Sequence, residues 1–508
     1  IQQGAHTTVA RWINVLPEKV VKTNPYLCVL HAWTLQLTGQ LKIADSRLVD
    51  AENALGNLKT GAEGGTDTIL GLIHFRRAYS TLLRGEHDKT ISYGQQALKQ
   101  LPETAALLRV RTVIFLDGAY RFQGQIQKAI AIFDDVMPII QSICVSSTVV
   151  LLYLHQGDLQ VEIAQLHRAR EIYEDTLKLI ERQTGRSDMP YAGYVYVGIG
   201  RIFHQWNQLD DAYRLIVKGV ALCRDWNVAD ILGLSLIELG YIHQSLGAYE
   251  KASEFIKEAA NVLEDISLWG SKIAAAHSVK FALARGDIEF AESWAQANDL
   301  DVDGDYEHYR EIEYLVLVRV LIAQERFDEA HSLVERIFRI AQEVGKRQTE
   351  LEVLILLSLV CSAQGETDQA FGYLEKALSI GEPEGYIRIF VDEGPSMASL
   401  LYEALKREIA PEYVQRLLTA FPVAESQGVT STESLVDQSG LIEPLSEREI
   451  DVLQLLAKGL TNQAIADRLV LSIHTVKAHT RSIYSKLAVN NRTQAVDRAR
   501  TLGVLPPI

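Results

Sequence analysis

A short turn signal recurs along the chain, and its spacing constrains the fold more than any other feature of the sequence. Each copy has Gly, or Asn or Glu in its place, and most copies have Ala five residues later, between two amphipathic segments. From the middle of the chain onward the turn residues stand at 207, 247, 286, 325 and 365, in steps of 39 or 40. One helix pair cannot bury its apolar face, so this repeat predicts helix pairs that stack into a solenoid.

The predicted turns cover most of the chain. Those followed by Ala are Gly39, Gly124, Asn207, Gly247, Gly286, Glu325 and Gly365, and those without it are Gly85 and Gly157. Gly adopts the backbone of a tight turn without penalty, and Ala lets the second helix approach the first closely. "LGAYEKASEF" also resembles a tetratricopeptide repeat (TPR). We therefore predict an all-α fold class with a TPR-like α-solenoid from about residue 20 to 380, followed by a shorter helical cap over 385–405, in a first domain spanning 1–420.

Composition limits the class of protein. The chain has 508 residues, too many for one ordinary core, and a formal net charge of −15. Residues 441–508 carry nine Lys and Arg against six Asp and Glu, or +3, so the rest carries −18. No uncharged apolar run of about 18 residues and no signal peptide occur, which predicts a cytoplasmic protein that contacts no membrane. The cysteines are predicted to be buried, reduced thiols: Cys28, Cys144, Cys223 and Cys361.

The last part of the chain reads as a separate module. "AESQGVTSTESLVDQSG" at 424–440 is rich in Ser, Thr, Gly and Gln and predicts a flexible linker over 421–440. The following domain, 441–508, begins with Ser446 and Glu449 at capping-box spacing, and its first helix stops at Gly459. Further helix starts are marked by Thr461, Ser472 and Asn491. Four short helices with a tight turn between the second and third predict a helix-turn-helix module.

The third helix of this module has two distinct faces. "SIHTVKAHTRSIYSKL" at 472–487 contains no carboxylate. Its apolar residues share one face, and they are Ile473, Val476, Ile483 and Leu487. Another face carries His474, Lys477, Ala478 and Arg481, with Lys486 beyond. Cations and the absence of acids suit a helix that lies in the major groove of DNA, although a basic helix is also common on solvated surfaces.

The module closely resembles the LuxR-type helix-turn-helix domain of bacterial transcription regulators. The matching marks are "LSEREI", "GLTNQAIA", "TVKAH" and "KLAVNNRTQA". With the helical array, the start "GAHTTVARWINVLPEKV" and the cap "RIFVDEG", the chain resembles the C-terminal part of the MalT-like (LAL) regulators. That resemblance implies a DNA-binding transcription regulator, expected to be an activator, whose array senses an inducer or protein partner. The alternative is a TPR-type interaction scaffold that uses the terminal module for self-association.

The resemblance also assigns roles to residues. Base-facing and groove-facing positions are Lys477, Ala478 and Arg481, and positions expected to contact phosphates are His474, Thr475, Asn491, Arg492 and Thr493. The basic Lys486 is expected to add to the phosphate contacts. In this family the fourth helix commonly serves in dimerisation, so the candidates for that role are Val496 and Ala499. The expected partners are double-stranded promoter DNA, a second copy of the chain in a dimer or oligomer, and RNA polymerase.

Other sites are disfavoured. MalT-like regulators carry an upstream ATP-binding domain, but no GxxxxGK[ST] loop occurs here, and "GAEGGTDT" at 61–68 lacks the Lys. We therefore expect a C-terminal part without that domain, no enzymatic activity and no cofactor in this chain. "DLDVDGDYEHYR" at 299–310 fits the start of a calcium loop, but Arg310 stands where the closing Glu is required. Tyr191 and Tyr194 share a helical face and are weak candidates for a ligand site, with core packing as the alternative.

Overall fold

The computed structural model describes most of the chain: residues 5–57, 65–140, 143–226, 228–264, 268–298, 306–421, 447–469, 473–486 and 492–501, with single positions at 300, 302, 304 and 489. Within these ranges the regular structure is helical and contains no strand, as the sequence predicts. No helix in the described ranges is long and apolar enough to cross a membrane. By its internal contacts the chain divides into two compact units: one comprises residues 1–207 and 215–421, and the other comprises 208–214 together with the C-terminal part that contains the terminal module.

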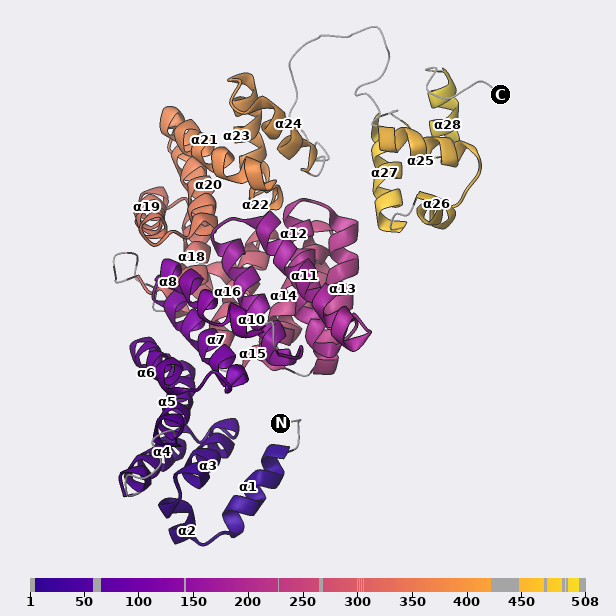
Figure 1. The fold of residues 1–508 in the computed structure, drawn as a ribbon. Helices are drawn as coiled ribbons and strands as arrows, with labels where there is room; N and C mark the ends of the chain where they lie inside the picture. Colours follow the sequence, from indigo (N-terminus) through magenta and orange to yellow (C-terminus); the bar gives the residue numbers. More distant parts are fainter. Residues whose placement is uncertain are drawn as a thin grey trace. The chain divides into compact units, whose positions relative to one another are not determined.

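The array consists of consecutive antiparallel helix hairpins (Figure 1). Two short helices precede it, α1 (Ala5–Val15) and α2 (Glu18–Thr23). The pairs are α3 (Pro25–Leu37) with α4 (Leu41–Gly56), α5 (Gly65–Leu83) with α6 (His87–Gln100), α7 (Ala106–Phe122) with α8 (Ile126–Ala131), α10 (Ser147–Glu162) with α11 (Leu166–Thr184), α12 (Gly193–Gln205) with α13 (Leu209–Trp226), α14 (Ala229–Ser245) with α15 (Tyr249–Glu264), α16 (Leu268–Ala284) with α17 (Ile288–Ala297), α18 (Glu311–Ala323) with α19 (Phe327–Val344), and α20 (Arg347–Ala363) with α21 (Thr367–Glu384). Short helical turns fill three connections, namely η1 (Ile132–Asp135) with α9 (Met137–Ile140), η2 (Pro190–Ala192) and η3 (His308–Arg310).

The predicted turn signal is confirmed at eight of its nine positions. Left-handed backbone, with φ between 58° and 81°, occurs at Gly39, Gly85, Gly124, Asn207, Gly247, Gly286, Glu325 and Gly365. The Ala five residues later is at most 1% exposed in every hairpin that has one: Ala44, Ala129, Ala212, Ala252, Ala291, Ala330 and Ala370. The small side chain therefore stands where the second helix of each hairpin approaches its neighbours most closely.

Gly157 is the ninth predicted turn, and this prediction is wrong. Gly157 lies inside α10, where a Cβ atom would come within 2.2 Å of the Tyr173 ring. The turn of this hairpin is at Ala164, which has φ of 57°, and Ala169 five residues later is fully buried. Ala164 follows Gly124 by 40 residues, so the regular step is kept, and the glycine serves helix packing instead.

Three cysteines are buried as predicted, and Cys144 is not. Cys28, Cys223 and Cys361 are fully buried in the array, and burial raises the pKa of each thiol to about 11. Cys144 is exposed in the connection between α9 and α10. Its apolar neighbours in the sequence suggested a helix interior, but the helix ends at Ile140.

Three cap helices complete the array at its C-terminal end. They are α22 (Arg388–Val391), α23 (Pro395–Lys406) and α24 (Pro411–Thr419). The first two lie where the sequence predicts a cap over 385–405, and α24 follows that range. One apolar cluster joins them to α20 and α21, and also to α10, α11 and α12 from the middle of the chain. Hydrogen bonds cross the same boundary: Trp206 Nε1 donates to the carbonyl of Glu384 at 2.8 Å, and the amide of Ile387 donates to the carbonyl of Gln205 at 2.8 Å. The array therefore closes on itself across about 180 residues of sequence.

A buried histidine at this boundary makes stability depend on pH. Burial, with the charges of Arg388 and Lys280, lowers the pKa of His204 to about 3, and its Nε2 lies 2.8 Å from the Ser245 hydroxyl. An unfolded histidine titrates near 6.5, so below that pH the unfolded chain binds the extra proton and is favoured. Stability from this group is complete above about pH 6.5 and is lost as the pH falls towards 3.

We expect the wild-type array to lose about 2 kcal/mol of unfolding free energy from this histidine between pH 7.5 and pH 5. His204→Gln keeps the side-chain volume and a polar partner for Ser245 without titrating, so its loss over the same interval should be smaller by that amount. Urea denaturation at the two pH values measures the difference, and exposed His167→Gln is the control. Equal losses in wild type and His204→Gln would contradict the assignment.

Candidate nucleic-acid interface

The terminal module is a bundle of four short helices: α25 (Glu447–Ala457), α26 (Asn462–Leu469), α27 (Ile473–Lys486) and α28 (Arg492–Thr501) (Figure 1). Helix α25 ends at Ala457, and Gly459 in the turn that follows has φ of 85°. The Thr461 hydroxyl caps α26 by accepting from the amide of Ala464 at 3.2 Å. Both marks are the ones that the sequence predicts. The core side chains are Val452, Leu453, Leu455, Leu456, Ile465, Ala466, Val476, Ile483, Ala495 and Ala499.

Helix α27 is held by one face. Val476 and Ile483 are fully buried in the core, and Thr480 between them is 8% exposed and donates its hydroxyl to the carbonyl of Val476. Lys477 is exposed on the other side of the helix. In an α-helix, His474, three residues before Lys477, and Arg481, four residues after it, lie on the side that is turned away from Val476 and Ile483. The backbone therefore places a basic, acid-free face opposite the face that docks the helix.

The side chains of several predicted contact residues lie outside the described part of the structure. His474, Thr475, Ala478, Arg481 and Thr493 have helical backbone in α27 or α28, and their side chains lie outside the described residues. Asn491 and the segment 422–446, which includes most of the predicted linker, also lie outside them. Lys486 is half-buried in the last turn of α27. The roles of these residues stay predictions that rest on helix position and on the resemblance.

Arg492 has a structural role that was not predicted. Its guanidinium donates to the carbonyl of Leu460 at 2.7 Å and to the carbonyl of Leu456 at 2.5 Å, at the C-terminal end of α25. A cation is favoured there because the last carbonyls of a helix lack backbone partners and carry its negative dipole end. Arg492 thus ties α28 to α25, and a part of its hydrogen-bonding capacity is used inside the module.

The two dimerisation candidates differ in exposure. Ala499 is fully buried in the module's own core. A side chain with no exposed surface cannot form a dimer interface, so the assignment of Ala499 is corrected to core packing. Val496 is half-buried at the edge of the same core and stays a candidate.

The array contains two weaker candidate sites, the acidic loop at 299–310 and the pair Tyr191 and Tyr194. Those of their residues that the structure describes make structural contacts. Asp299, Asp301 and Asp303 of the acidic loop lie outside the described residues, but Arg310 is described: its Nε donates to Glu313 at 2.9 Å. Tyr191 and Tyr194 are half-buried and pack against the large apolar cluster of the array. Burial and the charge of Asp158 raise the pKa of Tyr194 well above its usual range, so this phenol lies beside charged groups.

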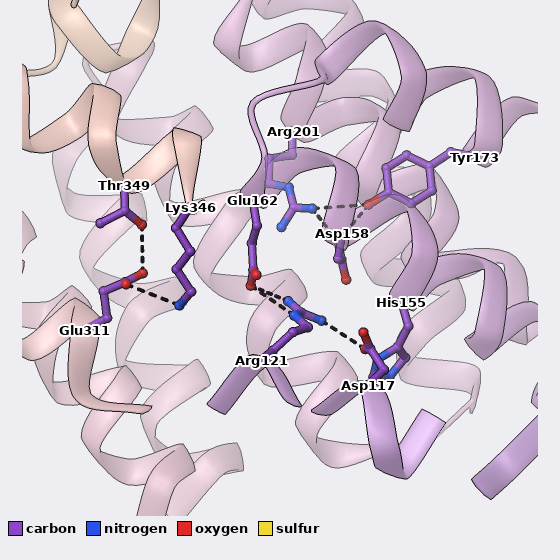
Figure 2. A network of polar contacts seen from close by, with 10 residues as sticks. All are labelled: Asp117, Arg121, His155, Asp158, Glu162, Tyr173, Arg201, Glu311, Lys346 and Thr349. Atoms are coloured by element: carbon purple, nitrogen blue, oxygen red, sulfur yellow. Dashed lines mark hydrogen bonds and ion pairs between the residues drawn. The ribbon is translucent and has the colours of Figure 1, made fainter. Parts of the chain in front are cut away.

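Those charged groups form a partly buried polar network between the hairpins (Figure 2). Arg121 of α7 donates two bonds to one oxygen of Glu162 of α10, at 2.6 and 3.1 Å. Arg201 of α12 and the Tyr173 hydroxyl of α11 both donate to Asp158, at 2.5 and 2.7 Å. These ion pairs join three neighbouring hairpins through their side chains.

A second group of polar contacts lies at the starts of α18 and α20. Lys346 and Thr349 both donate to Glu311, at 3.2 and 2.9 Å (Figure 2). Burial alone would raise the pKa of Glu162, but the charges of Arg121 and Lys346 outweigh it and lower that pKa. The effect of Lys346 on Glu162 places the two groups of contacts close together, in agreement with the closure of the array.

The array matches the family described as the MalT-like TPR region over residues 71–407. The chain belongs to the MalT-like family. Its terminal module matches the bacterial regulatory proteins of the luxR family over residues 443–499. Both matches confirm the resemblance seen in the sequence, and the two segments have the order expected for MalT-like proteins.

Similar proteins align with the MalT-like chain over nearly its whole length. The HTH-type transcriptional regulator MalT of Vibrio campbellii is 22% identical over 523 residues, and that of Vibrio cholerae is 23% identical over 521 residues. Each alignment covers 98% of this chain and 56% of the relative, so the chain spans about half the length of these relatives. Among solved structures, a Rap protein complexed with Competence and Sporulation Factor has a TM-score of 0.51 at 11% identity, covering 71% of this chain and 98% of that chain. That likeness concerns the fold of the array.

Proposed function

We propose that this chain is the sensor and effector part of a DNA-binding transcription regulator. The observation that carries the proposal is the two-sided α27, whose Val476 and Ile483 are buried while Lys477 on the opposite side is exposed in a helix without acids. A reading helix needs a docked face and a free basic face, because phosphates repel carboxylates and attract cations. The match of the module to the luxR family and the names of the relatives support the same function.

In this proposal the array responds to an inducer or protein partner, and the module binds promoter DNA as a dimer or oligomer. Half-buried Val496 is offered as a contact between two modules. The regulator acts as an activator, with RNA polymerase as the partner that it recruits. The net negative charge of the array repels DNA, whereas the terminal module, with a net charge of +3, can approach DNA.

The test separates base reading from phosphate binding. DNA selected from a random pool by the wild-type chain provides the site, and fluorescence anisotropy provides the affinity. We expect Arg481→Ala to weaken binding to that site by about 5- to 150-fold with a changed base preference. Lys486→Ala should weaken all sequences similarly and reduce the salt slope by about 1.

Salt dependence also separates the regulator from the alternative of an interaction scaffold. Phosphate contacts release counterions, so DNA affinity should fall steeply between 50 mM and 200 mM salt. A module used only for self-association would show no selected site and no such slope, and that result would remove the proposal.

A further inference from the structure

Arg76 of α5 is a partly buried arginine without an acidic partner. Its Nε is buried and has no hydrogen-bond partner, and Arg76 forms no ion pair with any carboxylate in the described part of the chain. Burial, together with the nearby charge of Arg111, lowers the pKa of its guanidinium well below the usual range. Withdrawing a cation partly from water without a counter-charge costs stability, so a folded chain that keeps one calls for an explanation.

The other partly buried arginines of this region all have acceptors for their guanidinium groups, either a carboxylate or, for Arg109, the carbonyls of Leu98 and Leu101. Arg77, the next residue, pairs with Glu52 at 2.7 Å, and Arg47 pairs with Asp50 at 3.0 Å. Farther along the array Arg121 pairs with Glu162 at 2.6 Å. Carboxylates are abundant in this chain, with 65 Asp and Glu against 50 Lys and Arg, so a shortage of acids does not explain the exception.

The surroundings of Arg76 are aromatic and basic. Its guanidinium lies 5.7 Å from the centre of the Trp33 ring of α3 and 5.0 Å from that of Phe75. Tyr79 stands one turn along α5, and the charges of Arg76 and Arg111 both act on its phenol. Stacking on a ring fixes the plane of a guanidinium and leaves its edge free to bind an oxyanion through two parallel hydrogen bonds.

These residues lie on the first helices of three consecutive hairpins, α3, α5 and α7 (Figure 1). Arg111, on α7, is exposed and forms no ion pair with a described carboxylate. Asp230 acts electrostatically on Tyr79 but is within ion-pair distance of neither arginine. Helical repeat proteins commonly bind their ligands on an extended surface to which successive repeats contribute.

We propose that Arg76, with Arg111, Tyr79 and Trp33, forms a binding site for an oxyanion group, a carboxylate or a phosphate, of a small ligand. The anionic group of the ligand supplies the counter-charge that Arg76 lacks within the described part of the chain. Arg76 binds it in the plane set by Trp33, Arg111 contributes a second cation from the next hairpin, and the Tyr79 hydroxyl donates a further hydrogen bond. The site is in the array and does not depend on the function of the terminal module, so a failure of DNA binding would leave it untouched.

Trp33 provides the readout. Fluorescence of the whole chain is titrated with sodium phosphate in one arm and sodium acetate in the other, at pH 7 and constant ionic strength set with NaCl. Subtracting the same titration of Trp33→Phe isolates Trp33 from the other five tryptophans. We expect a saturable change in at least one arm, and the arm with the lower half-saturation concentration identifies the anion.

Arg76→Met keeps the length of the side chain and removes its charge, so it should abolish the saturable change. Arg77→Met is the matched control one residue away and should retain it. No saturable change below 50 mM in either arm, or an equal response in Arg76→Met, would overturn the proposal.

Thermal unfolding provides an independent test of the proposal. Without added anion, Arg76→Met should have a melting temperature equal to or above that of wild type, because an unpaired buried charge has been removed. When phosphate or acetate is added, whichever binds, the melting temperature of the wild type should rise by more than that of Arg76→Met. General stabilisation by salt is common to both proteins, so the difference reports binding at the site. A clear loss of stability in Arg76→Met without anion would mean that an internal partner already satisfies the arginine, which also overturns the proposal.

Discussion

Arg492→Ala should destabilise the terminal module and weaken DNA binding at every sequence. The substitution removes both bonds to the end of α25, at Leu456 and Leu460, and leaves their carbonyls without this partner. Bonds to a charged donor contribute about 1.5–3 kcal/mol each when buried, and partial exposure reduces this, so we expect a loss of about 2–4 kcal/mol. A domain of this size has only about 3–8 kcal/mol in total.

Hydrogen exchange of the module's amides in the whole chain measures this loss, and DNA affinity is measured on the same samples. Arg498→Ala is the matched control, because Arg498 is exposed on the same helix. The loss of stability in Arg492→Lys should lie between those of Arg492→Ala and Arg498→Ala, because an ammonium group cannot donate to both carbonyls as the forked guanidinium does. Protected amides together with lost DNA binding in Arg492→Ala would show instead that Arg492 acts on the phosphates.

Gly157→Ala should destabilise the array by about 2–3 kcal/mol. The added Cβ would stand 2.2 Å from the ring of Tyr173, which is fully buried and bonded to Asp158 at 2.7 Å. The Tyr173 ring cannot move away, because the backbone of Gly198 packs closely against its other edge. A Cβ atom built at Gly198 would be only 2.9 Å from the ring. Tyr173 is held between two glycines of neighbouring hairpins, and its removal from that slot would also break the bond to Asp158.

Gly372→Ala is the control for helix propensity. Gly372 is also inside a helix, is exposed, and has no other atom within 4 Å of an added Cβ. The same chemical change should therefore stabilise the array there by about 0.5–1 kcal/mol. Urea denaturation of the two variants should give shifts of opposite sign, and a Gly157→Ala variant as stable as wild type would contradict the packing described for Tyr173.

The local features of the fold could be predicted from the sequence because each has a local cause. A left-handed turn needs a residue that tolerates it, which marks Gly247 and Gly365, and a close helix approach needs a small one, which marks Ala252 and Ala370. Gly157 misled because glycine also serves close packing inside helices, and Ala164 escaped notice because alanine in a left-handed turn leaves no pattern. The sequence signal for this turn is its position 40 residues after Gly124, at the regular step of the repeat.

The non-local features could not be predicted in the same way. Nothing near Trp206 in the sequence indicates that its ring nitrogen binds the carbonyl of Glu384, because the contact depends on the summed rotation of the intervening hairpins. The role of Arg492 was hidden for a similar reason: its partners lie more than 30 residues earlier. In the module, the docked face of α27 was readable from Val476 and Ile483, while the base-contacting roles still rest on resemblance.

The closed array has a consequence for how it loses structure. In an open repeat protein each hairpin contacts only its neighbours, so unfolding can start at an end and proceed one repeat at a time. Here the bonds that join Trp206 to Glu384 and Ile387 to Gln205 fix a loop of about 180 residues, which raises the contact order and makes folding slower and more all-or-none. Hairpins from α10 to α24 should therefore melt as one cooperative unit, and a ligand that stabilises any one of them stabilises them all.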